Sequence, residues 1–211
     1  MFSNYTIYQI GVRLFWIVGF TITFLQSKMD IHRHLNTYHS SFSDTIAKYS
    51  THIGDGFFFT LVIIGFLFVS LRTSLLLLLS FLTSAGITQF LKKGVFPDVM
   101  RPMHYFQHDP NFHQIENFTY HFYNSFPSGH ATSCFALFTV LALTYSNNKL
   151  IQVACLVAAI LFSFTRVYLS QHFFQDILAG SIIGTFVAQY AFQYLNPYFE
   201  KWDYSILRKK K

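Results

Sequence analysis

The sequence predicts an all-α integral membrane protein with six transmembrane helices in one bundle. Two observations lead to this prediction. Hydrophobic residues make up 52% of the 211 residues and charged residues only 11%, a balance that is unusual for a water-soluble domain. The apolar residues also gather in long runs, and most of the polar residues lie between these runs.

Six apolar runs are candidates for membrane spans. A helix that crosses the hydrocarbon core needs about 20 apolar residues, although about 17 can suffice. The second and fourth runs are shorter, and we expect local bilayer thinning and snorkelling side chains to compensate for their length. The runs are Ile10–Leu25, Phe57–Leu71, Leu75–Leu91, Ala131–Tyr145, Leu150–Leu169 and Ile177–Leu195.

We expect one domain over residues 1–211, because no internal repeat or low-complexity linker divides the chain. The first run lacks a basic segment before it and a small-x-small cleavage pattern in Thr23–Met29, so we expect an uncleaved helix. The motifs described below lie within a core of about residues 57–195. Residues 26–56 and 103–126 are expected to form non-cytoplasmic loops, and residues 196–211 a basic cytoplasmic tail.

Lysine and arginine near the ends of the runs predict the orientation. The tail Arg208–Lys211 and the connections around Arg72 and Lys149 would share the cytoplasmic side of a six-span protein. The net charge of +6 suits an anionic inner leaflet, and no basic and aromatic stripe indicates a nucleic-acid partner. We therefore expect a protein of the bacterial inner membrane whose polar site is periplasmic. Its oligomeric state is left open.

Three polar stretches lie at junctions between apolar runs, where charge is unfavourable unless a site uses it. They are Lys93–Pro102, Pro127–His130 and Thr165–Asp176. In the six-span arrangement all three lie on the non-cytoplasmic face. Together they predict a catalytic site that handles an anion.

The residue types in these three stretches suit a phosphate group. Proline favours a first helical turn, and Ser128 and Gly129 would leave backbone N–H groups free at a helix N-terminus, which attracts anions. Arg101 and Arg166 carry planar forks that match phosphate oxygens, and Lys93 adds a point charge. These groups could stabilise a transferring phosphoryl group.

The third stretch adds a histidine and an aspartate spaced i, i+4. On the first turn of a helix His172 and Asp176 would share a face, and the carboxylate would accept the Nδ1 proton of the ring. Nε2 would then be free to attack phosphorus. His130 would protonate the leaving oxygen and later activate water.

These motifs resemble the type 2 phosphatidic acid phosphatase superfamily, which also contains the vanadium haloperoxidases. The family pattern is Lys-x6-Arg-Pro, then Pro-Ser-Gly-His, then Ser-Arg-x5-His-x3-Asp. Pro127–His130 is intact, and the third motif has Thr165 in place of serine. In the first motif seven residues separate Lys93 from Arg101, and Lys92 is one residue further away. We choose Lys93 because its spacing is closer to the family pattern.

The resemblance covers roughly residues 57–195 and implies a membrane lipid phosphatase that needs no metal and no cofactor. It implies a phosphohistidine intermediate, with His172 as nucleophile, Asp176 as its partner and His130 as acid and base. The residues around the phosphate would be Lys93, Arg101, Ser128, Gly129 and Arg166. Phosphatidic acid, phosphatidylglycerophosphate, undecaprenyl pyrophosphate and lipid A all remain possible substrates.

Other interpretations stay open. Each basic residue alone could be a snorkelling anchor, and a non-catalytic lipid-binding or transport protein could share the fold. A vanadate-dependent haloperoxidase is less consistent with six spans, since those enzymes are larger and soluble. The histidine-rich stretch 103–126 matches no standard metal-ligand spacing, and its phenylalanines favour a lipid-facing lid. Gly180 and Gly184 predict close helix packing, and Cys134 and Cys155 predict buried packing.

Overall fold

The computed structural model describes residues 6–204 and 206, and within them all regular structure is helical. Each of the six predicted apolar runs forms a helix. These are α1 (Ile7–Leu25), α4 (Gly56–Leu67), α5 (Leu71–Phe90), α7 (Gly129–Thr144), α8 (Lys149–Tyr168) and α9 (Phe174–Phe199). The polar stretches contain the short helices α2 (Lys28–Asn36), α3 (Ser41–Ser50) and α6 (Pro102–Phe106), and the turns η1 (Thr51–Gly54), η2 (Leu91–Val95) and η3 (Glu200–Trp202).

Among the described residues, three helices are long and apolar enough to span a membrane, namely α1, α5 continued by η2, and α8. A fourth candidate combines α3 and η1 with α4, two segments that meet at a bend of 55°. At about 1.5 Å per residue, the 12 residues of α4 are too short for a core of about 30 Å. All six predicted apolar helices are thus present among the described residues. Three of them, or four if the bent pair counts as one span, are long and apolar enough to cross a membrane.

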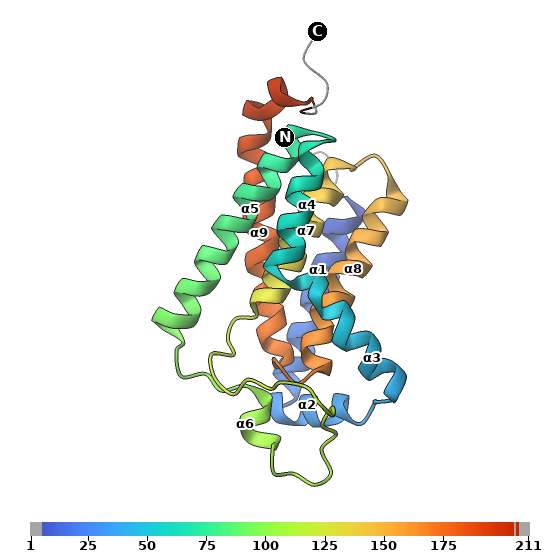
Figure 1. The fold of residues 1–211 in the computed structure, drawn as a ribbon, viewed down its shortest axis with the longest axis vertical. Helices are drawn as coiled ribbons and strands as arrows, with labels where there is room; N and C mark the ends of the chain where they lie inside the picture. Colours follow the sequence, from blue (N-terminus) through green and yellow to red (C-terminus); the bar gives the residue numbers. More distant parts are fainter. Residues whose placement is uncertain (1–5, 205, 207–211) are drawn as a thin grey trace.

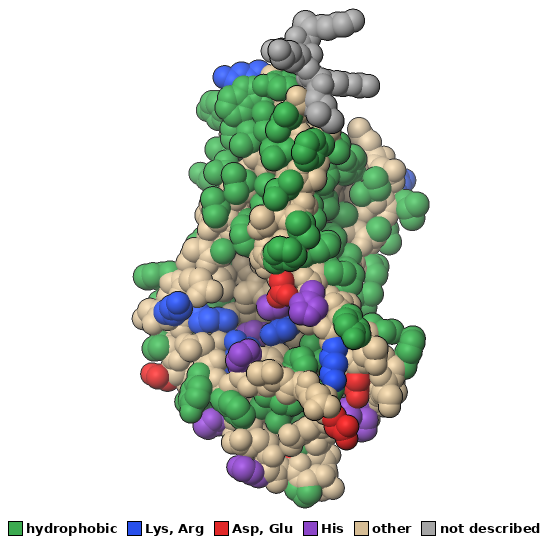
Figure 2. Space-filling view, viewed as in Figure 1, with side chains coloured by type: hydrophobic (Ala, Val, Ile, Leu, Met, Phe, Trp, Pro, Cys, Tyr) green, Lys and Arg blue, Asp and Glu red, His purple; other side chains and the backbone are tan. Residues whose placement is uncertain are grey.

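The exterior of the helices is apolar. Phe24, Phe57 and Leu150 are each more than three-quarters exposed, and Figure 2 shows hydrophobic side chains over the upper part of the molecule. A contiguous apolar surface of this kind is expected where lipid rather than water is the solvent. The protein is therefore an integral membrane protein.

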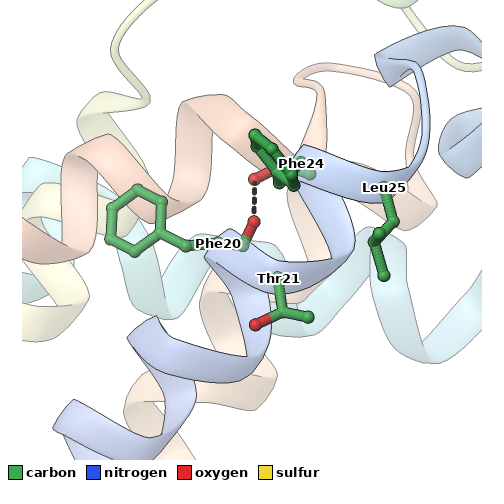
Figure 3. Close-up of a pocket in the computed structure, with 5 residues that line it drawn as sticks. Phe20, Thr21, Phe24 and Leu25 are labelled. Atoms are coloured by element: carbon green, nitrogen blue, oxygen red, sulfur yellow. Dashed lines mark hydrogen bonds between the residues drawn. The ribbon is translucent and has the colours of Figure 1, made fainter.

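A shallow hollow of about 520 Å³ lies on this apolar exterior at the end of α1. Phe20, Phe24 and Leu25 line it, and Thr23 there donates a hydrogen bond of 3.1 Å to the Phe20 carbonyl (Figure 3). Its lining comes from α1 alone and includes none of the predicted site residues.

The helices run between two ends that differ in polarity. At one end the Tyr8 backbone N–H donates to Gln152 at the start of α8, and Arg72 at the start of α5 donates to Asn196 near the end of α9. The opposite end carries α2, α6 and the long loop between α6 and α7 (Figure 1). The three predicted polar stretches lie at this second end. The tail Arg208–Lys211, on which the predicted orientation depends, lies outside the described residues.

Helices α7 and α9 approach each other closely at Gly180 and Gly184. A Cβ atom at Gly180 would lie 2.5 Å from the Ser128 carbonyl oxygen, and one at Gly184 would collide with the Thr132 carbonyl oxygen. These glycines therefore let the backbones of α7 and α9 pack together. The contact fixes the N-terminus of α7 against the first turns of α9.

Replacing Gly184 should therefore destabilise the fold. Gly184→Ala is expected to lower the free energy of unfolding by about 1–3 kcal/mol through overpacking. Gly86→Ala is the control, because no atom lies within 4 Å of its added Cβ, and it should leave stability unchanged or raise it. Thermal unfolding in detergent measures both. Equal melting temperatures for the two variants would contradict the close approach.

Candidate active site

His172 lies in a tight reversal between α8 and α9. The backbone N–H groups of Gln171 and His172 both donate to the Arg166 carbonyl, at 2.9 and 3.1 Å. Ser170 adopts a left-handed conformation with φ of 52°, which is uncommon for a residue other than glycine and is often found at functional sites. The reversal fixes His172 directly beside Arg166.

The Asp176 carboxylate organises this reversal. Its Oδ2 accepts hydrogen bonds from the Ser125 hydroxyl at 2.5 Å and the Phe173 backbone N–H at 2.9 Å, and lies 3.3 Å from His172 Nδ1. Because Phe173 caps α9, the helix begins at Phe174. The prediction that His172 lies on the first helical turn is therefore wrong. The pair meets because the chain turns just before the helix.

The environment of His172 keeps its ring neutral. The side chain is almost fully buried, and burial, followed by the positive charges of Arg101, Lys92 and Arg166, lowers the pKa of His172 well below its usual range. With the Nδ1 proton directed at Asp176, the lone pair of the ring is on Nε2. A buried neutral imidazole can act as a nucleophile.

The N-terminus of α7 lies against Asp176. The Ser128 backbone N–H donates to the Asp176 carbonyl at 3.0 Å, and the Ser128 hydroxyl caps Ala131. The helix begins at Gly129, so Pro127 precedes the cap and is not part of the first turn. The expectation that the Ser128 N–H is free for an anion is therefore wrong. In the first turn the N–H groups of Gly129 and His130 are the ones that lack an intrahelical acceptor.

Arg166 has an open hydrogen-bonding position. The residue is 8% exposed, and its Nη1 donates to the Thr51 hydroxyl at 2.9 Å. Its Nε is buried and has no hydrogen-bond partner within the described part of the chain. A buried N–H without an acceptor is unfavourable, so this atom indicates where an anionic ligand would bind.

Arg101 is hydrogen-bonded to the loop before α7 and to Gln171. Its nitrogens donate to the carbonyls of Tyr123, Gln171 and Asn124 at 2.8, 3.0 and 3.4 Å, and to the Gln171 side chain at 3.2 Å. These bonds engage Nε, Nη1 and Nη2, and phosphate binding by Arg101 stays a prediction. Arg101 ties the loop before α7 to the residue that precedes His172. Burial lowers the pKa of Arg101, but its charge still acts on His172.

The lysine of the first motif is Lys92 rather than Lys93. Lys92 is buried, and its charge interacts with Arg101, Asp176 and Arg166, whereas Lys93 is exposed. The choice of Lys93 from the sequence is therefore wrong. Both residues lie in η2, a π-helical turn, which is wider than an α-helix and changes the register on which the spacing argument relied.

Two contributors to this region come from residues 26–56 and were missed by sequence reasoning. Asp55 Oδ1 lies 2.5 Å from His130 Nε2, and Thr51 contacts Arg166 as described above. Asp55 stands at the edge of an apolar run, and a charge at such a position could have indicated a site. Nothing local marks Thr51, since threonine is common in loops.

Phe106 and Phe112 of the loop 103–126 are buried against α2 and the start of α9, so these two rings do not form the expected lipid-facing lid. Phe106 and Phe112 are buried and stack 4.5 Å apart, and they pack with Phe173, the residue after His172. His32 of α2 stacks on both rings and its Nε2 lies 3.1 Å from the Ser170 hydroxyl. Burial lowers the pKa of His32 to about 3. The loop and α2 therefore support the reversal at Ser170.

Metal-binding groups do not gather here. Among residues 6–204 and 206, no three His, Cys, Asp or Glu side chains are arranged to hold a metal ion. Basic, acidic and histidine side chains instead surround a hollow below the apolar surface (Figure 2). Cys134 and Cys155 are free and buried.

Fold and site together define an all-helical membrane protein with a buried His–Asp pair beside an arginine that lacks an acceptor. The sequence profile of the PAP2 superfamily matches residues 73–199, which is more than half of the chain. The chain belongs to this superfamily, and the resemblance inferred from its motifs is confirmed.

Curated relatives match over shorter segments. Lipid phosphate phosphatase 1 of Arabidopsis thaliana is 38% identical over 93 residues, which cover 37% of this chain and 28% of the relative. Lipid A 1-phosphatase of Rhizobium etli is 35% identical over 85 residues, which cover 40% of this chain and 34% of the relative. The matched segments thus span about a third of the length of these relatives.

Two solved structures share the fold. LpxE of Aquifex aeolicus superimposes with a TM-score of 0.66 at 21% identity, covering 78% of this chain and 94% of the other. The transmembrane PAP2 type phosphatidylglycerolphosphate phosphatase of Bacillus subtilis superimposes with a TM-score of 0.65 at 20% identity, covering 89% and 96%. At these identities the likeness concerns the fold alone.

The two lysines of η2 should differ in their effect on anion binding. Lys92→Ala removes a buried positive charge, and we expect it to weaken orthovanadate binding about 10- to 100-fold, as charge-assisted hydrogen bonds do. Lys93→Ala is the matched control and should bind vanadate like the unaltered protein. Thermal shift in detergent with increasing vanadate measures both. A larger loss for Lys93→Ala would restore the original assignment.

Proposed function

We propose that the protein is a membrane lipid phosphatase that hydrolyses a phosphate ester or diphosphate through a phosphohistidine on His172. The observation that carries this proposal is the buried Arg166 Nε without a partner, next to a neutral histidine held by Asp176. A cation with an open donor beside a neutral nucleophile suits attack on phosphorus.

The first step transfers the phosphoryl group to the protein. Nε2 of His172 attacks phosphorus while the bond from phosphorus to the leaving oxygen breaks, and that oxygen takes the proton of His130. Arg166, Lys92 and the N–H groups of Gly129 and His130 would stabilise the charge on the other phosphoryl oxygens. These groups supply the positive charge that a divalent metal provides in other phosphatases, which supports metal independence.

The second step releases phosphate. His130, now neutral, takes a proton from water, and the water oxygen bonds to phosphorus as the P–N bond breaks. The electron pair of that bond returns to Nε2 of His172. Phosphate leaves, and His130 again carries the proton that the next first step requires.

Membrane lipids are the substrate class that fits this site. The hollow lies directly beside the apolar exterior of the helices (Figure 2), and curated relatives are named for lipid phosphate and for lipid A. A phosphorylated headgroup could reach Arg166 while its acyl chains stay in the bilayer. Phosphatidic acid, phosphatidylglycerophosphate, undecaprenyl pyrophosphate and lipid A remain candidates.

We propose further that the chain is one domain with six membrane-inserted helices and with the site on the periplasmic face of the inner membrane. The shorter helices α4 and α7 would require local thinning of the bilayer. The basic connections at Arg72 and Lys149 lie at the end opposite to the site, and basic connections favour the cytoplasm.

Removing the nucleophile should abolish turnover. His172→Ala is expected to lose hydrolysis of dioctanoyl phosphatidic acid and all acid-labile labelling of the protein with phosphate. Within the described part of the chain, no other imidazole contacts Asp176. The assay is run in EDTA, since the mechanism uses no metal. His108→Ala, at an exposed loop position, should behave like the unaltered protein. Normal hydrolysis by His172→Ala would contradict the mechanism.

The sidedness can be tested with single cysteines. Asn111→Cys in the loop of residues 103–126 should react with a membrane-impermeant maleimide in intact spheroplasts, whereas Asn147→Cys between α7 and α8 should react only after permeabilisation. Both positions are exposed. The unaltered protein is the control, because Cys134 and Cys155 are buried. The reverse labelling pattern would place the site on the cytoplasmic face.

A further inference from the structure

His130 has a carboxylate partner of its own, which the family motifs do not include. Asp55 Oδ1 lies 2.5 Å from His130 Nε2, and Asp55 Oδ2 lies 2.7 Å from His52 Nδ1. One carboxylate therefore joins a half-buried histidine to an exposed one, whose side chain is 71% exposed. The arrangement forms a second His–Asp pair in the site.

The backbone before Asp55 is held tightly against α7. A Cβ atom at Gly54 would lie 3.1 Å from both Cβ and Cδ2 of His130 and 3.2 Å from Cys134 Sγ. Thr51, three residues earlier in the same turn, contacts Arg166. The segment from η1 to the start of α4 therefore places two side chains in the site. Thr51 contacts Arg166, and Asp55 contacts His130.

The Asp55 carboxylate does not cap the helix that follows it. Asp55 is the N-cap residue of α4, where an aspartate commonly accepts a backbone N–H of the first turn. Here it makes no side-chain capping bond, and both oxygens are directed to the histidines. The carboxylate is thus used for His130 and His52 instead of for the helix.

We infer that Asp55 is a positioning residue for His130. The Asp55 carboxylate accepts the Nε2 proton, directs Nδ1 to the leaving oxygen and stabilises the protonated ring. His52 in turn orients the Asp55 carboxylate. This inference rests on the proposed phosphatase function. The close contact with Asp55 Oδ1 engages Nε2. We therefore assign the proton transfers to Nδ1, which donates its proton in the first step and accepts one from water in the second.

The charges around His130 explain why such a partner is needed. Burial disfavours a protonated His130 ring most, and the positive charges of Arg166 of α8 and Lys92 of η2 add to this effect. His172 also lies within electrostatic reach. The Asp55 carboxylate opposes the two cations. Asp55 itself faces His52, His130 and Arg166. Without the Asp55 carboxylate, a smaller fraction of the protein would carry the proton on His130 that the leaving oxygen requires.

The inference predicts a dependence on the leaving group. An alkoxide of a lipid is a poor leaving group and needs a proton as its bond to phosphorus breaks. A p-nitrophenolate leaves without one. A variant that impairs His130 as an acid should therefore slow the first step for a lipid phosphate far more than for p-nitrophenyl phosphate, whereas general damage to the fold would slow both alike.

The experiment compares Asp55→Asn with the unaltered protein in detergent, using dioctanoyl phosphatidic acid and p-nitrophenyl phosphate. We expect kcat for the lipid to fall about 10- to 100-fold with KM little changed, part of the 10²–10⁴ that general acid–base catalysis contributes. The first-turnover release of p-nitrophenolate should change by less than about threefold, since it needs no acid. Asp203→Asn is the matched control, because Asp203 pairs with Arg72 and Ser70 at the other end.

The possible outcomes separate the two proposals. Absence of phosphatase activity in the unaltered protein would overturn the proposed function. An active protein in which Asp55→Asn affects neither substrate, or both equally, would overturn the role of Asp55 alone. If Asp55→Asn fails to fold, the exposed His52→Ala takes its place. It should show a smaller loss, and one confined to the lipid substrate; equal effects on both substrates would again contradict the inference.

Discussion

The site depends on one buried carboxylate. Asp176 is 3% exposed, and a carboxylate in that environment is stable only where donors compensate for its lost hydration. Ser125 and the Phe173 N–H supply bonds of 2.5 and 2.9 Å to Oδ2, and His172 faces the same oxygen. The backbone carbonyl of Asp176 also accepts from Ser128. One residue therefore joins α9, the N-terminus of α7 and the His172 ring.

A second constraint comes from the segment before α4. Residues 26–56 were expected to form a loop, yet they place His32 under the Ser170 turn, Thr51 on Arg166 and Asp55 on His130. The short length of α4 and the 55° bend before it are part of this arrangement.

The sequence predicted features that depend on local pattern. Long apolar runs predicted all six large helices, and Gly180 and Gly184 predicted the close approach of α7 and α9. The motifs led to the correct superfamily. Whether each motif residue performs its assigned role is a proposal that the experiments above address.

Features that depend on distant partners could not be predicted. Thr51 and Arg166 are 115 residues apart, and no local pattern links them. The choice between Lys92 and Lys93 failed because a π-helical turn changes which side chain faces inward. The Ser128 N–H was expected to be free, but only the tertiary contact with Asp176 determines its acceptor. Arg101 likewise contacts loop carbonyls that the sequence does not bring near it.

The central claim is that His172 and Arg166 act on the same phosphoryl group. His172 Nε2 attacks its phosphorus, and the Arg166 Nε donates a hydrogen bond to one of its oxygens. A structure of the detergent-solubilised protein with orthovanadate tests it most directly, because vanadate adopts the geometry of a phosphoryl group under attack. We expect a bond between vanadium and Nε2 of His172, with vanadate oxygens accepting from Arg166 Nε and from the N–H groups of Gly129 and His130. Vanadate bonded to His130, or bound without contact to Arg166, would contradict this mechanism.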